Sequence, residues 1–319
     1  MPEGQGYASW AGIGVQSTLG TPVARTKFID FKSEGVELQL QQKPWIGASE
    51  TADRINTEVG RHSEGSMEVM GAFEGLESFF KALFGNNSVV TAVLSGTANS
   101  HTFTPKDSMK SPGLSLEINR DVIAFLYEGC QVEEVEFVQD SAEYLVVRFL
   151  FRGRDETQVS ASTPTFVPVL KIHASQLVFK VATVVTPINS YRISFKNNLT
   201  GFRPQLGTVV TREIIRGAKR SVTGEITIQF EDQNRYNEFK ALTNVALQWV
   251  YTGGAISGGG GNNYTLQIDM PQVNWQGRTP TVPGPGPLAV TFPFKAFMTG
   301  RATNDDISLV LKNAITSVT

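Results

Sequence analysis

The clearest signal in the sequence is the stretch Gly65–Gly85, GSMEVMGAFEGLESFFKALFG. A similar stretch, GEITIQFEDQNRYNEFKALTN, occupies Gly224–Asn244, and the two align without a gap at an offset of 159 residues. Because the chain has 319 residues, one repeat equals about half of it. That length exceeds the units of a solenoid, so the sequence predicts two tandem copies of one domain.

Each copy of this stretch has the pattern of a strand followed by a short helix. In the second copy, Ile226 and Ile228 alternate with Thr227 and Gln229, as in a half-buried strand. Asp232 is a suitable N-cap for the helix that follows. In the first copy, one helical face collects the apolar residues Leu76, Phe79, Phe80, Leu83 and Phe84. We therefore expect a mainly β fold of two tandem barrels or sandwiches, each with one short flanking α-helix.

Other strand-like segments match across the two halves at smaller offsets. Leu145–Arg152 aligns with Leu288–Lys295 at an offset of 143, and Leu116–Ile118 aligns with Leu266–Ile268 at an offset of 150. The offset falls if the second copy has shorter connections, since insertions and deletions collect in loops. These matches predict a first domain (26–160) and a second domain (161–319). Residues 1–25 are rich in Gly, Ser and Thr, which predicts an ordered N-terminal arm outside the core.

Composition and charge exclude several classes of function. The formal net charge is −2 and the sequence has no long run of Lys or Arg, which argues against strong nucleic-acid binding. The single cysteine, Cys130, excludes an intramolecular disulfide and fits a reducing cytoplasm. No window approaches 18 consecutive apolar residues, so we expect neither a membrane span nor a secretion signal.

Residue patterns for catalysis or cofactor binding are nearly absent. The histidines His62, His101 and His173 are far apart, without the spacing of a metal site. Gly12-Ile-Gly14 lacks the third glycine of a dinucleotide-binding loop, and no Gly-Lys-Ser/Thr phosphate loop occurs. We therefore predict that the protein is not an enzyme and uses no cofactor or metal.

The segment Gln131–Gln139, QVEEVEFVQ, is a charged strand with two possible roles. Val135 and Phe137 share one face, and Glu134 and Glu136 share the other. One interpretation is a solvated outer face. The other is an acidic wall along a channel, which would repel phosphates and let DNA slide without binding.

Three parts of the sequence resemble tail tube proteins of long, non-contractile bacteriophage tails. The opening Gly12–Ala24, GIGVQSTLGTPVA, is similar to their glycine-led strand that runs into a Gly-Thr-Pro turn. Val222–Ile226, followed by Phe230–Asp232 and a short Tyr/Phe helix, resembles their strand-and-helix signature. So does Gly129–Val132, the start of a strand that leads to Leu145–Arg152. The resemblance covers most of both halves.

The resemblance implies an architecture and a function. Subunits of that family close into rings whose sheets join into one barrel, and the rings stack through long loops and terminal arms. Single-domain members form six-fold rings, so a duplicated member is expected to form trimers. The expected function is a structural virion protein whose lumen holds the tape-measure protein and conducts DNA during injection. It would be made in the host cytoplasm and located in the virion tail, with other copies of itself, tape-measure, tail-tip and tail-terminator proteins as partners, DNA as passing cargo, and no membrane contact.

The resemblance also assigns roles to particular residues. Glu134 and Glu136 are expected to face the lumen. Two long segments with little strand pattern, 41–62 and 197–220, are expected to contact the next ring or a neighbouring subunit. Their candidate contact residues are Lys43, Trp45, Arg54, Arg61, Phe202, Arg203, Ile214, Ile215 and Arg216.

The alternative is a tandem β-sandwich binding module, such as a surface or baseplate protein that binds carbohydrate or a protein partner. A carbohydrate binder needs a local aromatic platform. The four tryptophans, Trp10, Trp45, Trp249 and Trp275, are instead scattered along the sequence.

Overall fold

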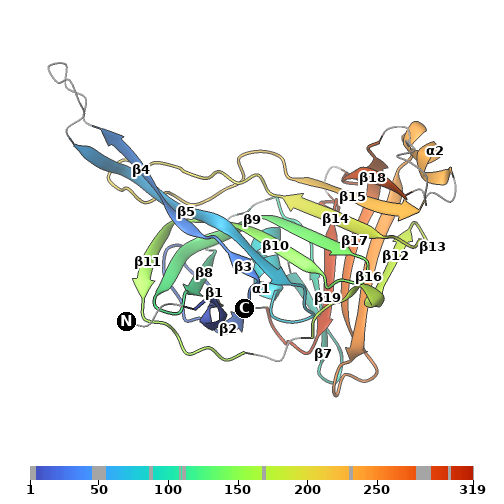
Figure 1. The fold of residues 1–319 in the computed structure, drawn as a ribbon, viewed down its shortest axis with the longest axis horizontal. Helices are drawn as coiled ribbons and strands as arrows, with labels where there is room; N and C mark the ends of the chain where they lie inside the picture. Colours follow the sequence, from blue (N-terminus) through green and yellow to red (C-terminus); the bar gives the residue numbers. More distant parts are fainter. Residues whose placement is uncertain are drawn as a thin grey trace.

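The computed structural model of the chain describes residues 5–44, 55–85, 89–107, 109, 113–166, 170–229, 233–277, 289–300 and 303–318. Strands make up 55% of the protein and helices 8%, so the predicted mainly β class is confirmed. Figure 1 shows an elongated molecule in which strands of the two halves lie side by side.

The first half begins with a single 3₁₀ turn and contains one α-helix. Its elements are η1 (Gly6–Ala8), β1 (Trp10–Val15), β2 (Lys27–Ile29), β3 (Ser33–Glu34), β4 (Glu37–Pro44), β5 (Asn56–Met70), α1 (Glu77–Phe84), β6 (Val89–Ser95), β7 (Ala98–Phe103), β8 (Leu114–Asn119), β9 (Ala124–Asp140), β10 (Val146–Gly153) and β11 (Asp155–Val159).

The second half follows the same plan without a counterpart of β6 and β7 among the residues that the structure describes. Its elements are η2 (Ala174–Gln176), β12 (Leu177–Val181), β13 (Val184–Val185), β14 (Ser190–Lys196), β15 (Ser221–Gln229), α2 (Asn234–Lys240), β16 (Val245–Ala255), β17 (Asn263–Trp275), β18 (Ala289–Ala296) and β19 (Ser308–Asn313).

Apart from the β6–β7 pair, the strand pairings of the first half recur in the second, and all are antiparallel. In the first half the pairs are β1–β2, β1–β8, β8–β9, β9–β11, β9–β10, β10–β5, and β5 with β3 and β4. In the second half they are β12–β13, β12–β16, β16–β17, β17–β19, β17–β18, β18–β15 and β15–β14. The same arrangement of paired strands therefore occurs twice along the chain.

This pairing pattern corrects one match made from the sequence. Leu266–Ile268 lies in β17, which pairs as β9 does, whereas Leu116–Ile118 lies in β8, whose counterpart is β16. The alignment was wrong because neighbouring strands in one sheet share the same apolar alternation, so periodicity alone does not distinguish them.

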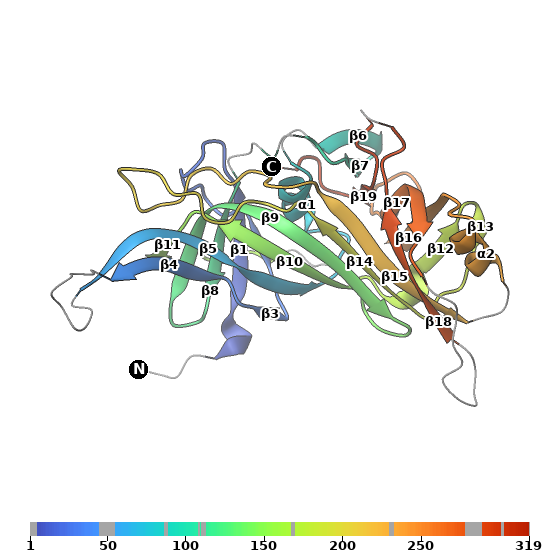
Figure 2. The ribbon, with the colours of Figure 1, turned by 90° about the horizontal axis from the view of Figure 1, so that it is seen from above.

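The two halves form one continuous sheet because β9 of the first half pairs with β14 of the second. The register runs from Glu134 opposite Lys196 to Asp140 opposite Ser190. The N-terminal part of β9 pairs instead with β8 and β11, and the strand changes sheets near Gly129, where φ is 62°. Figure 2 shows the resulting strand order, β4–β5–β10–β9–β14–β15–β18–β17, which we call the long sheet.

A second connection between the halves comes from the β6–β7 hairpin, which is inserted between α1 and β8. Strand β7 pairs with β19, and His101 lies opposite Leu311. The hairpin turn also docks on the second half, since the Thr97 N–H donates to Gly258 O at 3.1 Å. The hairpin therefore acts as a strap from the first half onto the second.

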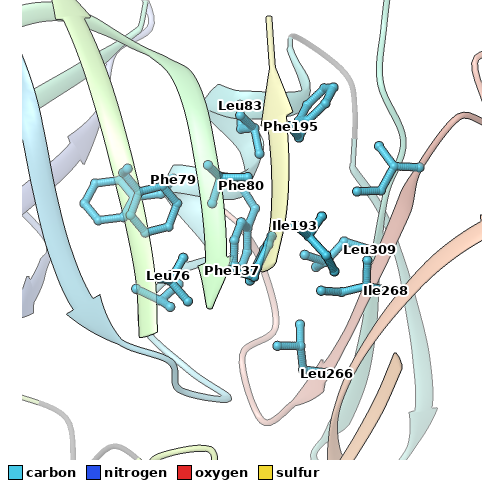
Figure 3. Close-up of a cluster of buried hydrophobic side chains, with 14 of the residues drawn as sticks. Leu76, Phe79, Phe80, Leu83, Phe137, Ile193, Phe195, Leu266, Ile268 and Leu309 are labelled. Carbon is cyan, nitrogen blue, oxygen red and sulfur yellow. The ribbon is translucent and has the colours of Figure 1, made fainter. Parts of the chain in front are cut away.

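Helix α1 packs into a core that both halves share, as Figure 3 shows. Its apolar face is buried as the helical spacing predicts. The Phe80 ring lies 6.1 Å from that of Phe137 on β9, and the Phe84 ring lies 5.3 Å from that of Phe195 on β14. Helix α2 forms at its predicted place, although none of its residues is fully buried, and its predicted cap Asp232 lies outside the described residues.

The expectation that residues 1–25 lie outside the core is wrong for β1. This strand pairs with β2 on one edge and β8 on the other, and the Ala11 and Ile13 side chains are fully buried. Its glycines lower strand propensity, which hid the element from the sequence pattern. A Cβ at Gly14 would lie 2.5 Å from Ala24 O, so this close approach of two backbone segments requires glycine.

The segment 41–62 is also more regular than expected in its described residues. Strand β4 continues to Pro44 and β5 begins at Asn56, so the two strands form a hairpin arm that projects from the body (Figures 1 and 2). We call residues 39–44 and 55–60 the β4–β5 arm. Its side chains are largely exposed on both faces, which removes the alternation that marks a strand in sequence.

A buried polar network fixes the pairing of β9 with β14. Gln139 of β9 reaches the core of the second half, where its side-chain oxygen accepts a hydrogen bond from the Tyr251 hydroxyl. The Tyr191 hydroxyl contacts the Tyr251 hydroxyl, and the Gln139 amide donates to Glu143 O at 3.1 Å. Burial raises the pKa of both tyrosines, so their hydroxyls stay neutral hydrogen-bonding groups.

We predict that Tyr251→Phe lowers the free energy of unfolding by about 1–3 kcal/mol, because the buried Gln139 oxygen loses its donor. Urea unfolding followed by fluorescence measures the change. The control is Tyr144→Phe, since Tyr144 is about half exposed. Equal, small effects of the two substitutions would contradict a stabilising role for the network.

Candidate assembly interface

Glu134 and Glu136 lie on the face of the long sheet that is turned away from the core. Their neighbours Val135 and Phe137 are buried, as the alternation predicts. This face continues across β5, β10, β9, β14, β15 and β18, and its residues are mostly polar or charged, although Glu136 itself is buried.

Both carboxylates have cationic partners on neighbouring strands. Glu134 accepts a hydrogen bond from the Ser194 hydroxyl at 2.6 Å and pairs with Lys196 at 3.1 Å. Glu136 lies between Arg192 of β14 and Arg148 of β10, the latter at 3.4 Å. The face is therefore charge-balanced here and not purely acidic, and three of these partners also tie β14 to β9.

The charged cluster continues into the first half but not into the equivalent place in the second. Glu68 pairs with Lys32 at 2.9 Å and with Arg148 at 2.8 Å. Hydrogen bonds from Lys32 and Arg148 hold the pKa of the Glu68 carboxyl below its ordinary value. At the corresponding positions of the second half, the hydroxyls of Thr227 and Thr291 lie 2.9 Å apart.

The two predicted contact segments lie against each other within the chain. The Arg61 N–H donates to Val209 O at 2.7 Å, and the Thr211 N–H donates to Arg61 O at 3.1 Å. The ring of Phe202 lies 5.8 Å from that of His62, directly over Gly60. The loop 197–220 thus runs along the base of the β4–β5 arm (Figure 2).

The other candidate residues of loop 197–220 also contact their own chain. The Arg203 guanidinium donates to Glu213 O, and Ile214 is buried in a small cluster with Met109 and Leu199. Ile215 is partly exposed, and its carbonyl accepts from the Thr200 N–H at 2.8 Å. Arg216 donates to the carbonyls of Lys106 and Asp107, each at 3.1 Å, and to the Asn197 side chain.

In the β4–β5 arm, Lys43 is exposed on β4, whereas Trp45 and Arg54 lie outside the described residues. The assignment of the arm and of loop 197–220 to contacts with a neighbouring ring or subunit stays a prediction.

The structure shows which strands have an open edge, and β4 and β6 are two of them. In the described residues, β4 pairs only with β5, and β6 pairs only with β7. Strand β6 is exposed on both faces, including Val90 and Val93. Open edges present unpaired backbone groups to other chains, so they are candidate assembly sites. Single-sequence patterns do not report which strand lies at an edge.

The three histidines are separated in the structure. His62 is buried beside Phe202, and burial lowers its pKa. His101 is buried between Thr91 and Asn313, and His173 lies near the β9–β10 turn beside Tyr144. Among the residues described, no group of three or more His, Cys, Asp or Glu side chains is placed to hold a metal ion. Over those same residues, no helix is both long and apolar enough to cross a membrane.

Comparison with known proteins places this architecture in a family. A family model described as phage tail tube protein matches residues 10–296, from the first residue of β1 to the last residue of β18. The chain belongs to the phage tail tube protein family. The resemblance seen in the sequence is therefore confirmed, and the family identifies this tail tube protein as a structural component of the virion tail. No curated protein matches the chain.

We predict that Glu68→Gln destabilises this tail tube protein at pH 7 but has little effect in acid. The pKa of Glu68 is held below its ordinary value of 4.5, so its stabilising effect is present above that pH and is lost as the pH falls through the lowered pKa. Thermal unfolding from pH 7 to pH 3 should show a difference in Tm from wild type that shrinks toward zero. Glu225→Gln serves as the control, because Glu225 is exposed. A Tm difference between Glu68→Gln and the wild type that does not change with pH would contradict a stabilising role of the ionised Glu68 carboxylate.

We predict that Gly60→Val displaces loop 197–220 from β5. A Cβ at Gly60 would lie 2.1 Å from the Phe202 ring, so the ring must move. Limited trypsin digestion should then cleave faster after Arg203 and Arg212 than in the wild type. Gly254→Val is the matched control, because a Cβ there meets no atom within 4 Å. Unchanged cleavage in Gly60→Val would show that the loop is not anchored by this contact.

Proposed function

We propose that this chain is a duplicated tail tube protein of a long-tailed, non-contractile phage, and that three chains close into a ring. Stacked rings form the tube, and the polar face of the long sheet, with Glu134 and Glu136, lines its lumen. The lumen holds the tape-measure protein and conducts DNA during injection. Family membership and the pairing of β9 with β14 support this proposal.

The pairing of β9 with β14 carries the argument for ring closure. It joins β9, the strand at one edge of the first half's part of the long sheet, to β14, the strand at the adjoining edge of the second half's part. Because both halves have the same arrangement, β4 holds the place in the first half that β14 holds in the second, and Gln276, directly after β17, holds the place that Glu134 holds on β9. Joining these two places between chains would extend the same sheet around a closed barrel.

The internal repeat predicts which residues meet at the joint between chains. The Gln276 N–H donates to Pro293 O at 2.6 Å, so Gln276 lies beside β18 as Glu134 lies beside β10. Leu38 and Gln39 lie on β4 where Phe195 and Lys196 lie on β14. We therefore propose that the end of β17 pairs with β4 of the neighbouring chain, starting near Leu38.

Of residues 33–39, which match residues 190–196 of β14, backbone geometry leaves Leu38 and Gln39 open to a neighbouring chain. The Gly35 N–H donates to Ser66 O at 2.8 Å, so by the alternation of an antiparallel ladder the Leu38 N–H points away from β5. At Val36, the outward-facing position two residues before Leu38, both backbone groups are already bonded. The Val36 N–H donates to Glu34, and Val36 O accepts from Arg120 and Tyr127. Leu38 is thus the first position where the outward edge is free for a partner strand.

The remaining parts of the proposal concern stacking and partners. The β4–β5 arm with Lys43, the residues Trp45 and Arg54 next to it in the sequence, and loop 197–220 meet the next ring. The ends of the tube meet tail-tip and tail-terminator proteins, and DNA is passing cargo. The protein is made in the host cytoplasm.

The burial of tryptophans favours the tube over a carbohydrate-binding module. Trp249 and Trp275 are fully buried in the second half, and Trp10 is buried in β1. None of these three is available for a sugar-stacking platform, which needs exposed aromatic faces. The fourth, Trp45, lies outside the described residues.

We predict that Leu38→Pro prevents ring formation while leaving a folded chain. Proline removes an outward N–H at the proposed joint but no bond to β5. Negative-stain electron microscopy across a concentration series should show rings or tubes for the wild type and for the control Leu38→Ala, and only single particles for Leu38→Pro. Circular dichroism checks that the proline variant is folded. Normal tubes from Leu38→Pro would exclude this edge from the joint.

A further inference from the structure

The ends of the two helices differ in exposure, although the helices align without a gap. In that alignment Leu83 of α1 corresponds to Leu242 after α2, and Phe84 corresponds to Thr243. The end of α1 is buried, since Leu83 is 0% exposed and Phe84 1%. At the end of α2, Leu242 is 70% exposed and Thr243 is also exposed. The second half therefore leaves open a helix end that is covered in the first half.

The end of α1 is covered at the joint between the two halves. The ring of Phe195 on β14 stacks on the Phe84 ring, with centroids 5.3 Å apart. The side chain of Asn197, directly after β14, has no exposed area and donates to Leu83 O at 2.6 Å and to Val132 O of β9 at 3.2 Å. Strand β7 also contacts this helix end. A strand of the second half thus packs on the helix of the first.

The end of α2 lies at the corresponding place on its own half. Trp275 of β17 corresponds to Val132 of β9, because each lies opposite the same position of the next strand of the long sheet. The side chain of Asn274, next to Trp275, donates to Leu242 O at 3.4 Å. The last turn of each helix therefore lies beside the same point of the long sheet.

The backbone at Leu242 is unusual for a leucine. The Thr243 N–H donates to Glu238 O at 2.9 Å and the Leu242 N–H donates to Phe239 O at 3.1 Å, which is the Schellman pattern of a helix C-terminus. Leu242 holds the left-handed position of this motif, with φ 50°, where glycine is the usual residue. A large apolar side chain there is strained and exposed to water in the isolated chain, so burial in an interface would compensate the cost.

The internal repeat identifies the segment that would cover this helix end. Leu38 and Leu40 of β4 correspond to Phe195 and Asn197, by the pairing of β4 with β5 and of β14 with β15. Leu40 is 46% exposed and lies on the same face of β4 as Leu38. Figure 1 shows β4 toward one end of the molecule and α2 at the other, so β4 cannot cover α2 of its own chain.

We propose that the end of helix α2 binds strand β4 of the neighbouring chain in the ring, and that Leu40 of that strand packs on Leu242. The inference rests on the ring proposed above and deepens it by naming a side-chain contact at each joint between chains. The occupant is a second copy of this chain. The base of the β4–β5 arm then contacts a neighbour in its own ring, and the rest of the arm extends beyond this contact.

The residues at the two joints compensate one another. Within the chain, the Asn197 amide provides a donor for Leu83 O. At the end of α2, Leu242 O already accepts from Asn274 of its own half, so the neighbouring strand need not supply a donor there. It supplies Leu40 instead, which places an apolar side chain against an apolar side chain. Burial of both leucines removes exposed apolar surface from water, which favours association.

Cysteine cross-linking between chains tests the contact. Chains with Leu40→Cys are ¹⁵N-labelled, mixed with unlabelled chains with Leu242→Cys, assembled and oxidised. We expect disulfides that join labelled to unlabelled chains, identified by mass spectrometry of the linked peptides. The native Cys130 is fully buried and does not compete. Val122→Cys in place of Leu242→Cys is the control, because Val122 is 59% exposed but lies between β8 and β9, and we expect no such disulfides from it.

A glycine variant gives a second measurement with two opposite effects. Leu242→Gly should raise the Tm of the isolated chain, because glycine adopts the left-handed conformation without strain. It should also raise the protein concentration needed for rings by about tenfold or more, because a buried leucine is lost from each joint. Ala142→Gly is the matched control, since Ala142 has φ 67° and is exposed between β9 and β10. This control should leave assembly unchanged.

Two results would overturn the inference and leave the ring intact. One is normal ring formation by Leu242→Gly, and the other is rings of the cysteine variants without disulfides between labelled and unlabelled chains. If the unmodified chain forms no rings under any condition, the proposed function fails and this inference fails with it.

Discussion

The rest of the structure depends on the backbone pairing of β9 with β14. This ladder joins two halves that have the same strand arrangement, and it makes one sheet with one polar face from them. Side chains stabilise this ladder on both faces of the sheet. The Gln139–Tyr251–Tyr191 network fixes the core side, and Glu134 and Glu136 with their cations fix the polar side. Because a shift of one residue would reverse both faces, the two sets of contacts specify a single register.

The connection within the chain and the proposed connection between chains are not equivalent. The β6–β7 hairpin straps the first half to the second through β19, whereas the connection Ala241–Asn244 at the same place in the second half is too short to form a hairpin. The peptide link also docks on the first half, where the Ile172 N–H donates to Gly71 O at 2.9 Å. The chain therefore behaves as one building unit, and a ring made from it should separate at chain boundaries before it separates at the β9–β14 ladder.

The sequence predicts the local elements well and the long-range contacts poorly. Strands β5, β15, β10 and β18 and helix α1 could be predicted because alternation and helical spacing are local signals that occur in both halves. Strand β1 was indicated only by the family resemblance and not by the apolar pattern, because its glycines are needed for a backbone approach that only the folded chain shows. The cations beside Glu136 come from Arg148 and Arg192, on strands whose pairing with β9 has no local signature. Which edges stay open is also set by pairing across the whole chain, so the sequence alone did not locate them.

The central claim is that the two halves act as successive units of one ring, so that three chains complete it. Native mass spectrometry of rings released from tubes at low protein concentration tests this claim most directly. The account predicts a closed species with the mass of three chains and no smaller closed ring. A ring with the mass of six chains would contradict it, because each chain would then contribute only one unit to the barrel.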